Sequence, residues 1–326
     1  MRRIPAEDCR SRLRRGLVPA VPVMFKASGP IDWVAQERYV KYMSNLPIAG
    51  VAVWAHTGRG LHLSREQRLP ILESWARSLR VKKMVIAGVG GVAEALDASS
   101  WTASALVMAQ DAAEHGADAF LVYPPGNFGD DADRERLAVE YHAQLAGLGV
   151  PLILFYLYPA AGGMDYSPDL LRQLLALPEV VGIKVATLDN VMSFQNIENL
   201  IAREFPEKLL ITGEDRFFGY SLMCGAQAAL VGMGAVCTTL QHNMMEAWFG
   251  GNAKKFVNLS RKVDRLGQAL FVPPMEGYIG RLLAVLVHQG LLERESGHDP
   301  WGPELRESEF IQLRETLRGL GELLEV

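Results

Sequence analysis

Residues 152–184 have the sequence LILFYLYPAAGGMDYSPDLLRQLLALPEVVGIK. Two apolar runs, Leu152–Tyr156 and Val180–Val185, lie at its two ends. Between them, a segment with leucines at helical spacing starts at Ser167-Pro-Asp. A serine N-cap, a proline at the first helical position and an acid in the first turn are typical of a helix start. Uninterrupted apolar runs are typical of strands buried on both faces, as in a parallel sheet covered by helices. This stretch therefore predicts a strand–helix–strand unit.

The same alternation recurs along most of the chain. A capping box at Ser64-Arg-Glu-Gln67 predicts a helix start, and Pro70 favours a kink inside that helix. Apolar residues at helical spacing from Trp101 to Ala112 predict another helix, which Gly116 ends. The expected strands are Leu17–Val23, Gly50–Ala55, Met84–Gly88, Ala119–Tyr123, Leu152–Tyr156, Val180–Val185, Leu209–Thr212 and Ala228–Val231. Eight strand–helix repeats are what a (β/α)₈ TIM barrel requires, so the predicted fold class is α/β with this barrel.

The last part of the chain has a different pattern, because no strand is expected after Val231. Residues 239–326 have helical patterns only, with turns predicted at Val272-Pro-Pro274 and His298-Asp-Pro300. We therefore expect a barrel over residues 1–238 and a C-terminal helical extension over the remainder.

The composition is that of an ordinary globular protein. Hydrophobic residues make up 49% of the 326 residues and charged residues 21%, which excludes a disordered or collagen-like chain. The net charge of −4 argues against a nucleic-acid-binding protein, which needs a strong basic excess. Cys9, Cys224 and Cys237 form no CxxC pair, so we expect neither a disulfide framework nor a zinc ribbon, and a reducing compartment.

No stretch predicts a membrane span or a signal peptide. The most apolar run, Val150–Ala161, is too short to cross a bilayer and contains two prolines. Six arginines lie within the first fifteen residues, but no apolar segment follows them, so we expect a short basic surface helix. These observations predict a cytoplasmic protein that binds neither membrane nor nucleic acid.

Polar side chains at the carboxyl ends of the expected strands are the candidates for chemistry, because barrels of this kind place their active sites there. Lys184 ends an apolar run, where burial disfavours the charged amine. A neutral amine can form an imine with a carbonyl substrate, whereas the structural alternative is a lysine whose head reaches solvent. Tyr156 ends the preceding strand, where it serves either as a proton shuttle for that amine or as a core aromatic residue.

The turn Ala55-His-Thr-Gly-Arg59 follows the second expected strand. Its backbone N–H groups, the Thr57 hydroxyl and the small Gly58 are suited to hold a substrate carboxylate. His56 is a candidate metal ligand or acid–base group. The absence of a second histidine at ligand spacing argues against a metal site, so we expect none.

Two further stretches follow expected strands. The backbone of Thr212-Gly-Glu-Asp215, notably Gly213, is expected to line the same pocket as Val231 at the end of the last strand; the alternative is an acidic N-cap for the next helix. Gly88-Val-Gly-Gly-Val-Ala93 fits a loose dinucleotide-binding fingerprint. Because that fingerprint belongs to the first strand of a βαβ unit and this one follows the third, we expect a simple turn.

Together these motifs resemble those of the dihydrodipicolinate synthase / N-acetylneuraminate lyase family of pyruvate-dependent class I aldolases. The resemblance covers nearly the whole chain, and its tyrosine and lysine motifs are specific in combination. The stretches that carry it are Gly16–Phe25 with Gly29–Asp32 (opening strand and turn), Ala55–Arg59 (G-T/S-T-G-E loop), Phe155-Tyr-Leu-Tyr-Pro159 (Y-N-x-P), Gly182-Ile-Lys184 (G-I/L-K), Thr212–Asp215 (S-G-D-D) and Pro274–Leu292 (C-terminal helices).

The resemblance implies a (β/α)₈ barrel with C-terminal helices that needs no cofactor. It also implies a homo-oligomer, usually a homotetramer, and we expect a dimer or tetramer. By resemblance, Lys184 forms the imine with pyruvate or another 2-keto acid, and Tyr156 relays protons. The Thr57 hydroxyl with the His56 and Thr57 amides holds the carboxylate. The expected catalytic residues are therefore Lys184, Tyr156 and Thr57, and the expected substrate-binding residues are His56, Thr57, Arg59, Gly213 and Val231.

Several positions depart from the family pattern. Dihydrodipicolinate synthases carry a tyrosine that reaches a neighbouring subunit's site, but Tyr123-Pro-Pro-Gly126 has none in register. Ala161 stands where they carry an arginine for the second substrate's carboxylate, and the loop has His56 and Arg59 in place of threonine and glutamate. We therefore expect a Schiff-base lyase with another second substrate, and Arg59 as a contact for an anionic partner.

Three alternatives stay open on the sequence alone. A 2-keto acid dehydratase or hydratase would use the same lysine, and a catalytically silent protein would bind the 2-keto acid reversibly without an adduct. A nicotinamide-dependent oxidoreductase would use the turn at Gly88 and show a cofactor-dependent absorbance change.

Overall fold

The computed structural model describes residues 4–79, 82–91, 97–125, 128 and 131–322. Within these residues, eight parallel strands form one sheet in the order β1-β8-β7-β6-β5-β4-β3-β2. A bridge between Ala20 and Ala52 joins β1 to β2 and brings the two edges of the sheet together. The strands are β1 (Leu17–Pro19), β2 (Gly50–Val53), β3 (Met84–Val89), β4 (Ala119–Val122), β5 (Leu152–Leu157), β6 (Val180–Ala186), β7 (Leu209–Thr212) and β8 (Ala228–Val231). The predicted TIM barrel is confirmed.

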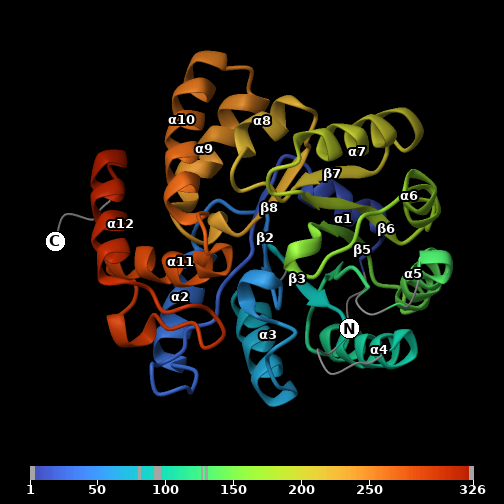
Figure 1. Cartoon of the computed structure of the whole chain (residues 1–326), viewed down its shortest axis with the longest axis horizontal. Coiled ribbons are helices and arrows are strands. Elements are labelled where there is room, and N and C mark those ends of the chain that lie inside the picture. Colours follow the sequence, from blue (N-terminus) through green and yellow to red (C-terminus); the bar gives the residue numbers. More distant parts are fainter. Residues whose placement is uncertain (1–3, 80–81, 92–96, 126–127, 129–130, 323–326) are drawn as a thin grey trace.

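Helices alternate with the strands and surround the barrel (Figure 1). They are α2 (Trp33–Ser44), α3 (Arg65–Leu79), α4 (Ala98–Glu114), α5 (Asp131–Ala146), α6 (Pro168–Leu175), α7 (Val191–Glu204), α8 (Phe218–Met223) and α9 (Thr238–Phe249). The capping box before α3 is present, since the Ser64 N–H donates to Gln67 Oε1 at 3.0 Å and the Gln67 N–H donates to Ser64 Oγ at 3.3 Å. Because α9 follows β8, it completes the eighth strand–helix unit. The boundary expected at residue 238 falls at the start of this helix.

A β-bulge interrupts the pairing of β5 with β6. Leu152 pairs with Val180, but Ile153 pairs with Gly182, so β6 carries one extra residue at Val181. A bulge changes the face to which the following side chains point, because side chains alternate along a strand.

This bulge decides where Lys184 lies. Val181 and Phe155 belong to the apolar cluster inside the barrel, and Phe155 is the register partner of Lys184. The next pair, Tyr156 and Val185, belongs to the cluster between the strands and the helices. A strand that continued regularly from Val181 would point Lys184 outward, so the extra residue turns this lysine into the barrel.

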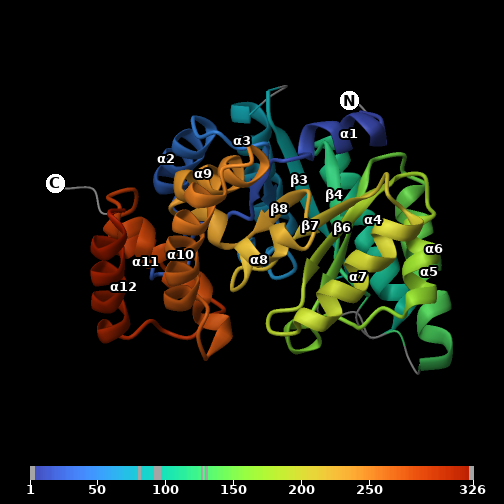
Figure 2. The same cartoon turned by 90° about the horizontal axis from the view of Figure 1, so that it is seen from above.

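The N-terminal helix α1 (Ala6–Leu13) closes one end of the barrel (Figure 2). It corresponds to the expected basic helix, but its apolar face is buried. Ile4, Cys9 and Leu13 join the apolar cluster of the barrel interior. Cys9, Cys224 and Cys237 are free thiols.

Beyond the barrel, the chain continues as α10 (Ala253–Leu270), α11 (Tyr278–His288) and α12 (Glu307–Leu320). These helices lie on one side of the barrel in both views, with α12 at the outer edge. Across the described residues, no single helix is long and apolar enough to cross a membrane. One pair of helical segments, Ala253–Leu270 and Met275–His288, is long and apolar enough when the two are taken together. The pair is bent by 111° at the break between them.

The segment between α11 and α12 returns to the barrel. The Ala27 N–H donates to the Glu295 carbonyl at 3.1 Å, and the His298 N–H donates to the Phe25 carbonyl at 3.2 Å. These contacts place residues of the C-terminal helical region beside the loop that follows β1.

Candidate active site

A small cavity of about 50 Å³ has Lys184 in its wall. Lys184 is 6% exposed, and its Nζ lies 4.0 Å from the centroid of the Phe155 ring. Burial lowers the pKa of Lys184 to about 8, against the opposing effect of Asp215 and Glu214. An amine with such a pKa has a neutral fraction at neutral pH, and the neutral form is the one that attacks a carbonyl carbon.

The cavity is built from loops at the carboxyl ends of β2, β5, β6, β7 and β8, together with the C-terminal region. Its lining residues are His56, Thr57, Phe155, Leu157, Tyr158, Lys184, Ala186, Leu188, Gly213, Glu214, Asp215, Gly232, Phe271, Met275 and Tyr278. This is the face on which barrels of this type carry their active sites.

Gly213 leaves the space that the lysine side chain occupies. A Cβ at this position would lie 2.6 Å from Lys184 Cε and 3.0 Å from the Val185 carbonyl oxygen. The expected contact at Gly213 is therefore present in the cavity wall. Val231 is not in the wall, because its side chain packs in the cluster outside the strands, and the next residue, Gly232, lines the cavity instead.

Two buried carboxylates stand near the amine. Glu214 accepts hydrogen bonds from the Thr187 N–H at 2.5 Å, the Thr187 hydroxyl at 2.9 Å and the Leu188 N–H at 3.1 Å. Asp215 accepts one from the Met233 N–H at 2.7 Å. Burial raises the pKa of both carboxyl groups, that of Glu214 to about 7. None of these donors belongs to the first turn of α8, and α8 has no side-chain cap. The alternative that Glu214 or Asp215 caps this helix is therefore not supported.

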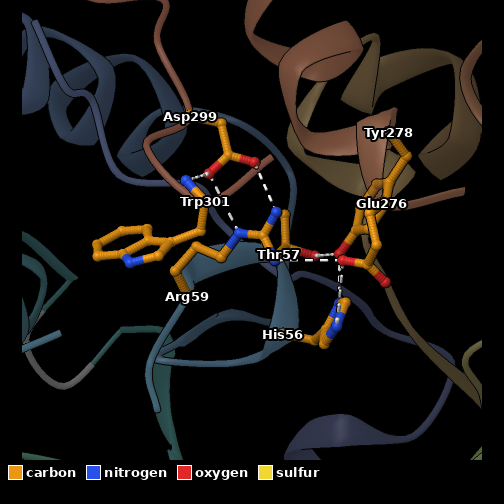
Figure 3. Close-up of polar contacts among 7 residues, drawn as sticks. All are labelled: His56, Thr57, Arg59, Glu276, Tyr278, Asp299 and Trp301. Carbon is orange, nitrogen blue, oxygen red and sulfur yellow. Dashed lines mark hydrogen bonds and ion pairs between the residues drawn. The ribbon is translucent and has the colours of Figure 1, made fainter. Parts of the chain in front are cut away.

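The loop after β2 meets the start of α11 at a three-residue hydrogen-bond network (Figure 3). The Tyr278 hydroxyl lies 3.0 Å from His56 Nδ1 and 3.0 Å from Thr57 Oγ1. The Tyr278 ring stacks on Phe271 with the centroids 4.9 Å apart. Glu276 Oε2 lies 4.0 Å from His56 Nε2. A hydroxyl, a phenol and an imidazole are thus connected in a row beside the lysine.

The protonation states of this network follow from burial. Burial raises the pKa of Tyr278, which keeps its phenol protonated. Burial lowers the pKa of His56, although Glu276 opposes the shift. A neutral His56 can accept a proton from the Tyr278 hydroxyl, whereas an imidazolium cannot.

The loop that carries His56 begins and ends in backbone conformations that side chains rarely adopt. Trp54 has φ 56° and Arg59 has φ 52°. Gly88 provides room for this path, since a Cβ there would lie 2.4 Å from the Trp54 carbonyl oxygen. The close approach of Trp54 therefore explains the glycine at position 88 without a bound dinucleotide. Residues 92 and 93 of the fingerprint lie outside the described residues. Gly126, which marks the departure from the family's tyrosine position, lies outside them as well.

The structure does not bring Tyr156 to Lys184, and the prediction that the two lie side by side is wrong. The Tyr156 hydroxyl donates to Asp165 Oδ1 at 2.6 Å, and its ring contacts Tyr166 in the layer between strands and helices. Phe155 takes the inward position instead. The ends of β5 and β6 are neighbours, as expected. Successive side chains of one strand point to opposite faces, however, so Phe155 points toward Lys184 and Tyr156 points away from it.

Arg59 is not available as the expected contact for an anion. Its Nε and Nη2 donate to Asp299 at 3.1 and 2.7 Å, and its Nη1 donates to Glu276 at 3.2 Å (Figure 3). The side chains of Arg59 and Asp299 are 7% and 4% exposed. This buried ion pair ties the loop after β2 to the segment before α12.

Breaking this pair should destabilise the fold. We expect Asp299→Asn to lower the free energy of unfolding by about 3 kcal/mol, the lower end for a broken buried pair, because Glu276 still contacts the guanidinium. Urea denaturation measures the change. The matched control is Glu204→Gln, which breaks the exposed pair with Arg172 and should have no measurable effect. Equal stability of Asp299→Asn and the parent chain would contradict this role.

Tyr278 and Glu276 had no counterpart among the residues expected from the sequence. Tyr278 is 222 positions from His56 along the chain, and only the packing of α11 against the barrel brings them together. A tyrosine at a helix start carries no local signal of its own. Asp215 belongs to a stretch that the sequence predicts to line the pocket. That prediction concerned the backbone of the stretch and not the Asp215 carboxylate.

The described residues contain no group of three or more histidine, cysteine, aspartate or glutamate side chains placed to hold a metal ion.

Comparisons with known proteins agree with this architecture. The model of a family described as the dihydrodipicolinate synthetase family matches residues 13–318. The 4-hydroxy-tetrahydrodipicolinate synthase of Thermodesulfovibrio yellowstonii is 26% identical over 259 residues, which cover 79% of this chain and 83% of that protein. N-acetylneuraminate lyase 2 of Escherichia coli O6:H1 is 22% identical over 293 residues, which cover 89% of each.

A solved structure shows the shared fold. YagE, a prophage protein of the dihydrodipicolinic acid synthase family from Escherichia coli K12 solved in complex with pyruvate, superposes with a TM-score of 0.81 at 21% identity. The match covers 94% of this chain and 98% of that chain.

Proposed function

This chain belongs to the dihydrodipicolinate synthetase family, and on that premise we propose that it is an aldolase-type lyase whose Lys184 forms an imine with pyruvate or another 2-keto acid. The observation that carries the proposal is the buried Lys184 amine, which faces a small cavity beside a hydroxyl–phenol–imidazole network. The named relatives are a synthase and a lyase, and YagE was solved with pyruvate, which supports the substrate class.

The loop after β2 binds the carboxylate of the 2-keto acid. The Thr57 hydroxyl and the amides of His56 and Thr57 hold the carboxylate, because the first N–H groups of the short helix His56–Gly58 precede its first internal hydrogen bond. The carboxylate then orients the keto carbon toward Lys184. We place the three-carbon unit in the small cavity with its methyl group toward the network, because the three residues of the network are in the cavity wall.

The chemistry begins with attack of the neutral Lys184 amine on the keto carbon. The hydroxyl of the resulting carbinolamine takes up a proton from solvent and leaves as water, and a protonated imine remains. This cation withdraws electrons from the adjacent carbon, so loss of a proton there leaves an enamine nucleophile. As Tyr278 takes up that proton, it donates its own phenol proton to the neutral His56, and the reverse transfer later returns a proton to the substrate.

Exchange of the pyruvate methyl protons for deuterium tests this function without knowledge of the second substrate. In D₂O, the enzyme should exchange these protons at least about 10²-fold faster than the Lys184→Met variant, the usual scale of positioned acid–base catalysis. Proton NMR follows the loss of the methyl signal. Equal exchange by the two proteins would contradict the proposal.

The pH dependence follows from the lowered pKa of Lys184. The amine must be neutral in the free enzyme, so kcat/KM for exchange should rise about tenfold per pH unit below pH 8 and level off above it. Exchange rates at low pyruvate concentration between pH 6 and 10 measure this profile. A profile that is flat or falls over this range would show that Lys184 does not control the reaction.

A further inference from the structure

A second cavity adjoins the one that contains Lys184. Its volume is about 310 Å³, against about 50 Å³ for the first, and His56 and Leu157 line both. About 300 Å³ is the lower end of the range for small-molecule sites. The first cavity suits a three-carbon keto acid, and the second leaves room for a larger partner next to it.

Among the residues that the structure describes, most of the wall of this second cavity is apolar, and its ionisable members are His56, Arg59 and His62. Leu61, Trp101, Pro124 and Leu157 contribute carbon surface, with glycine and alanine around them. Tyr123 is also in the wall, but its hydroxyl donates to the Trp54 carbonyl at 3.0 Å. Tyr123 is therefore left with its aromatic ring as the surface that it offers to a ligand.

The arginine in the wall, which also contains His56 and His62, is already paired with carboxylates. Arg59 contacts two carboxylates, Asp299 and Glu276, through three hydrogen bonds. One guanidinium against two carboxylates leaves a local excess of negative charge. A ligand carboxylate brought into such a cavity would lose its hydration without gaining an unpaired cation from Arg59.

We propose that the second cavity binds the carbonyl partner of the reaction and selects a neutral aldehyde with an aromatic or branched apolar group. This rests on the proposed function. The enamine carbon attacks the aldehyde carbon, a C–C bond forms, and the aldehyde oxygen takes the proton that the network removed from the keto acid. Water then hydrolyses the imine, which frees Lys184 and releases a 4-hydroxy-2-keto acid. The reverse sequence cleaves that product.

Three aldehydes test the selection: benzaldehyde, 4-formylbenzoate and the methyl ester of 4-formylbenzoate. The last two differ chiefly in charge, so size does not account for a difference between them. With pyruvate, we expect kcat/KM for the ester to exceed that for 4-formylbenzoate at least about tenfold, and benzaldehyde to be a substrate. Formation of the aldol product is followed by NMR.

Ala161 provides a matched pair of variants, because it lines this cavity and not the first. Ala161→Arg adds a cation and should shift the ester-to-carboxylate ratio at least about tenfold toward 4-formylbenzoate. Ala161→Met adds similar bulk without charge and should leave the ratio within about threefold of the parent value.

The outcomes separate this proposal from the one on which it rests. If the enzyme does not exchange the pyruvate methyl protons, the proposed function fails and the aldehyde assignment fails with it. If exchange is normal but benzaldehyde gives no product, or 4-formylbenzoate is the better substrate, the cavity does not select neutral aldehydes while the function stands. An equal shift in both Ala161 variants likewise overturns the electrostatic argument.

Discussion

The Lys184→Met variant is expected to lose at least about 10⁴-fold in kcat and to keep its fold, because it removes the nucleophile itself. Methionine retains the unbranched chain that lies over Phe155 and introduces no buried charge. Lys184→Arg should be as inactive, since an arginine stays protonated and cannot form the imine. Initial rates measure the loss, and circular dichroism with a thermal scan checks the fold.

Lys208 provides the control for this variant. It is also 6% exposed, and burial also lowers its pKa, but its Nζ donates to the carbonyls of Leu177 and Val180 away from the cavity. The Lys208→Met variant should keep its turnover wherever it is folded. A Lys184→Met enzyme that retains more than about 1% of the parent kcat would contradict the role of Lys184.

Tyr278→Phe should lower kcat by about 10²–10⁴-fold, the usual effect of removing a positioned acid–base group. The phenyl ring keeps the stacking on Phe271 and loses only the hydroxyl between His56 and Thr57. Imine formation should persist, so pyruvate binds and is trapped by borohydride while proton exchange is slow. Methyl-proton exchange and adduct yield, measured on one preparation, separate the two steps.

Tyr156→Phe is the matched control for this prediction. This variant also removes a phenol hydroxyl. The Tyr156 hydroxyl lies between the strands and the helices, where it contacts Asp165 and not the network of His56, Thr57 and Tyr278. We expect its kcat to stay within about tenfold of the parent value. A larger loss for Tyr156→Phe than for Tyr278→Phe would return the proton relay to Tyr156.

The strands of the barrel were predictable because their burial on both faces produces uninterrupted apolar runs. Leu152–Leu157 and Val180–Ala186 are each bounded by turn signals, and each extends only one residue beyond its prediction. β1 is shorter than predicted, since Pro19 and Pro22 cannot donate to a ladder. The end of the barrel is harder to place from the sequence, because α9 has the same helical pattern as the helices after it.

The position of Lys184 was predictable, but the face to which its neighbours point was not. A β-bulge at Val181 shifts the alternation by one residue, and no residue type in that run signals the shift. The same ambiguity made Tyr156 look like a neighbour of the amine, although Phe155 occupies that place. Register comes from pairing with the next strand, which a single run of residues does not contain.

The partners of the loop after β2 depend on tertiary packing alone. Tyr278 and Asp299 lie more than two hundred residues from His56 and Arg59, and they reach the loop only because the C-terminal region folds back on the barrel. From the sequence alone, a lone arginine in a turn therefore predicts a contact with a substrate anion. Its carboxylate partner was hidden in a predicted turn, His298-Asp-Pro300.

Reductive trapping shows directly which lysine forms the imine. The protein is incubated with pyruvate, treated with borohydride, digested and mapped by mass spectrometry. We predict one covalently attached three-carbon acid per chain, on the peptide that contains Lys184, with no adduct in Lys184→Met and an unchanged adduct in Lys208→Met. An adduct on Lys208 or any other lysine, or no adduct with pyruvate or any other 2-keto acid, would contradict imine formation by Lys184.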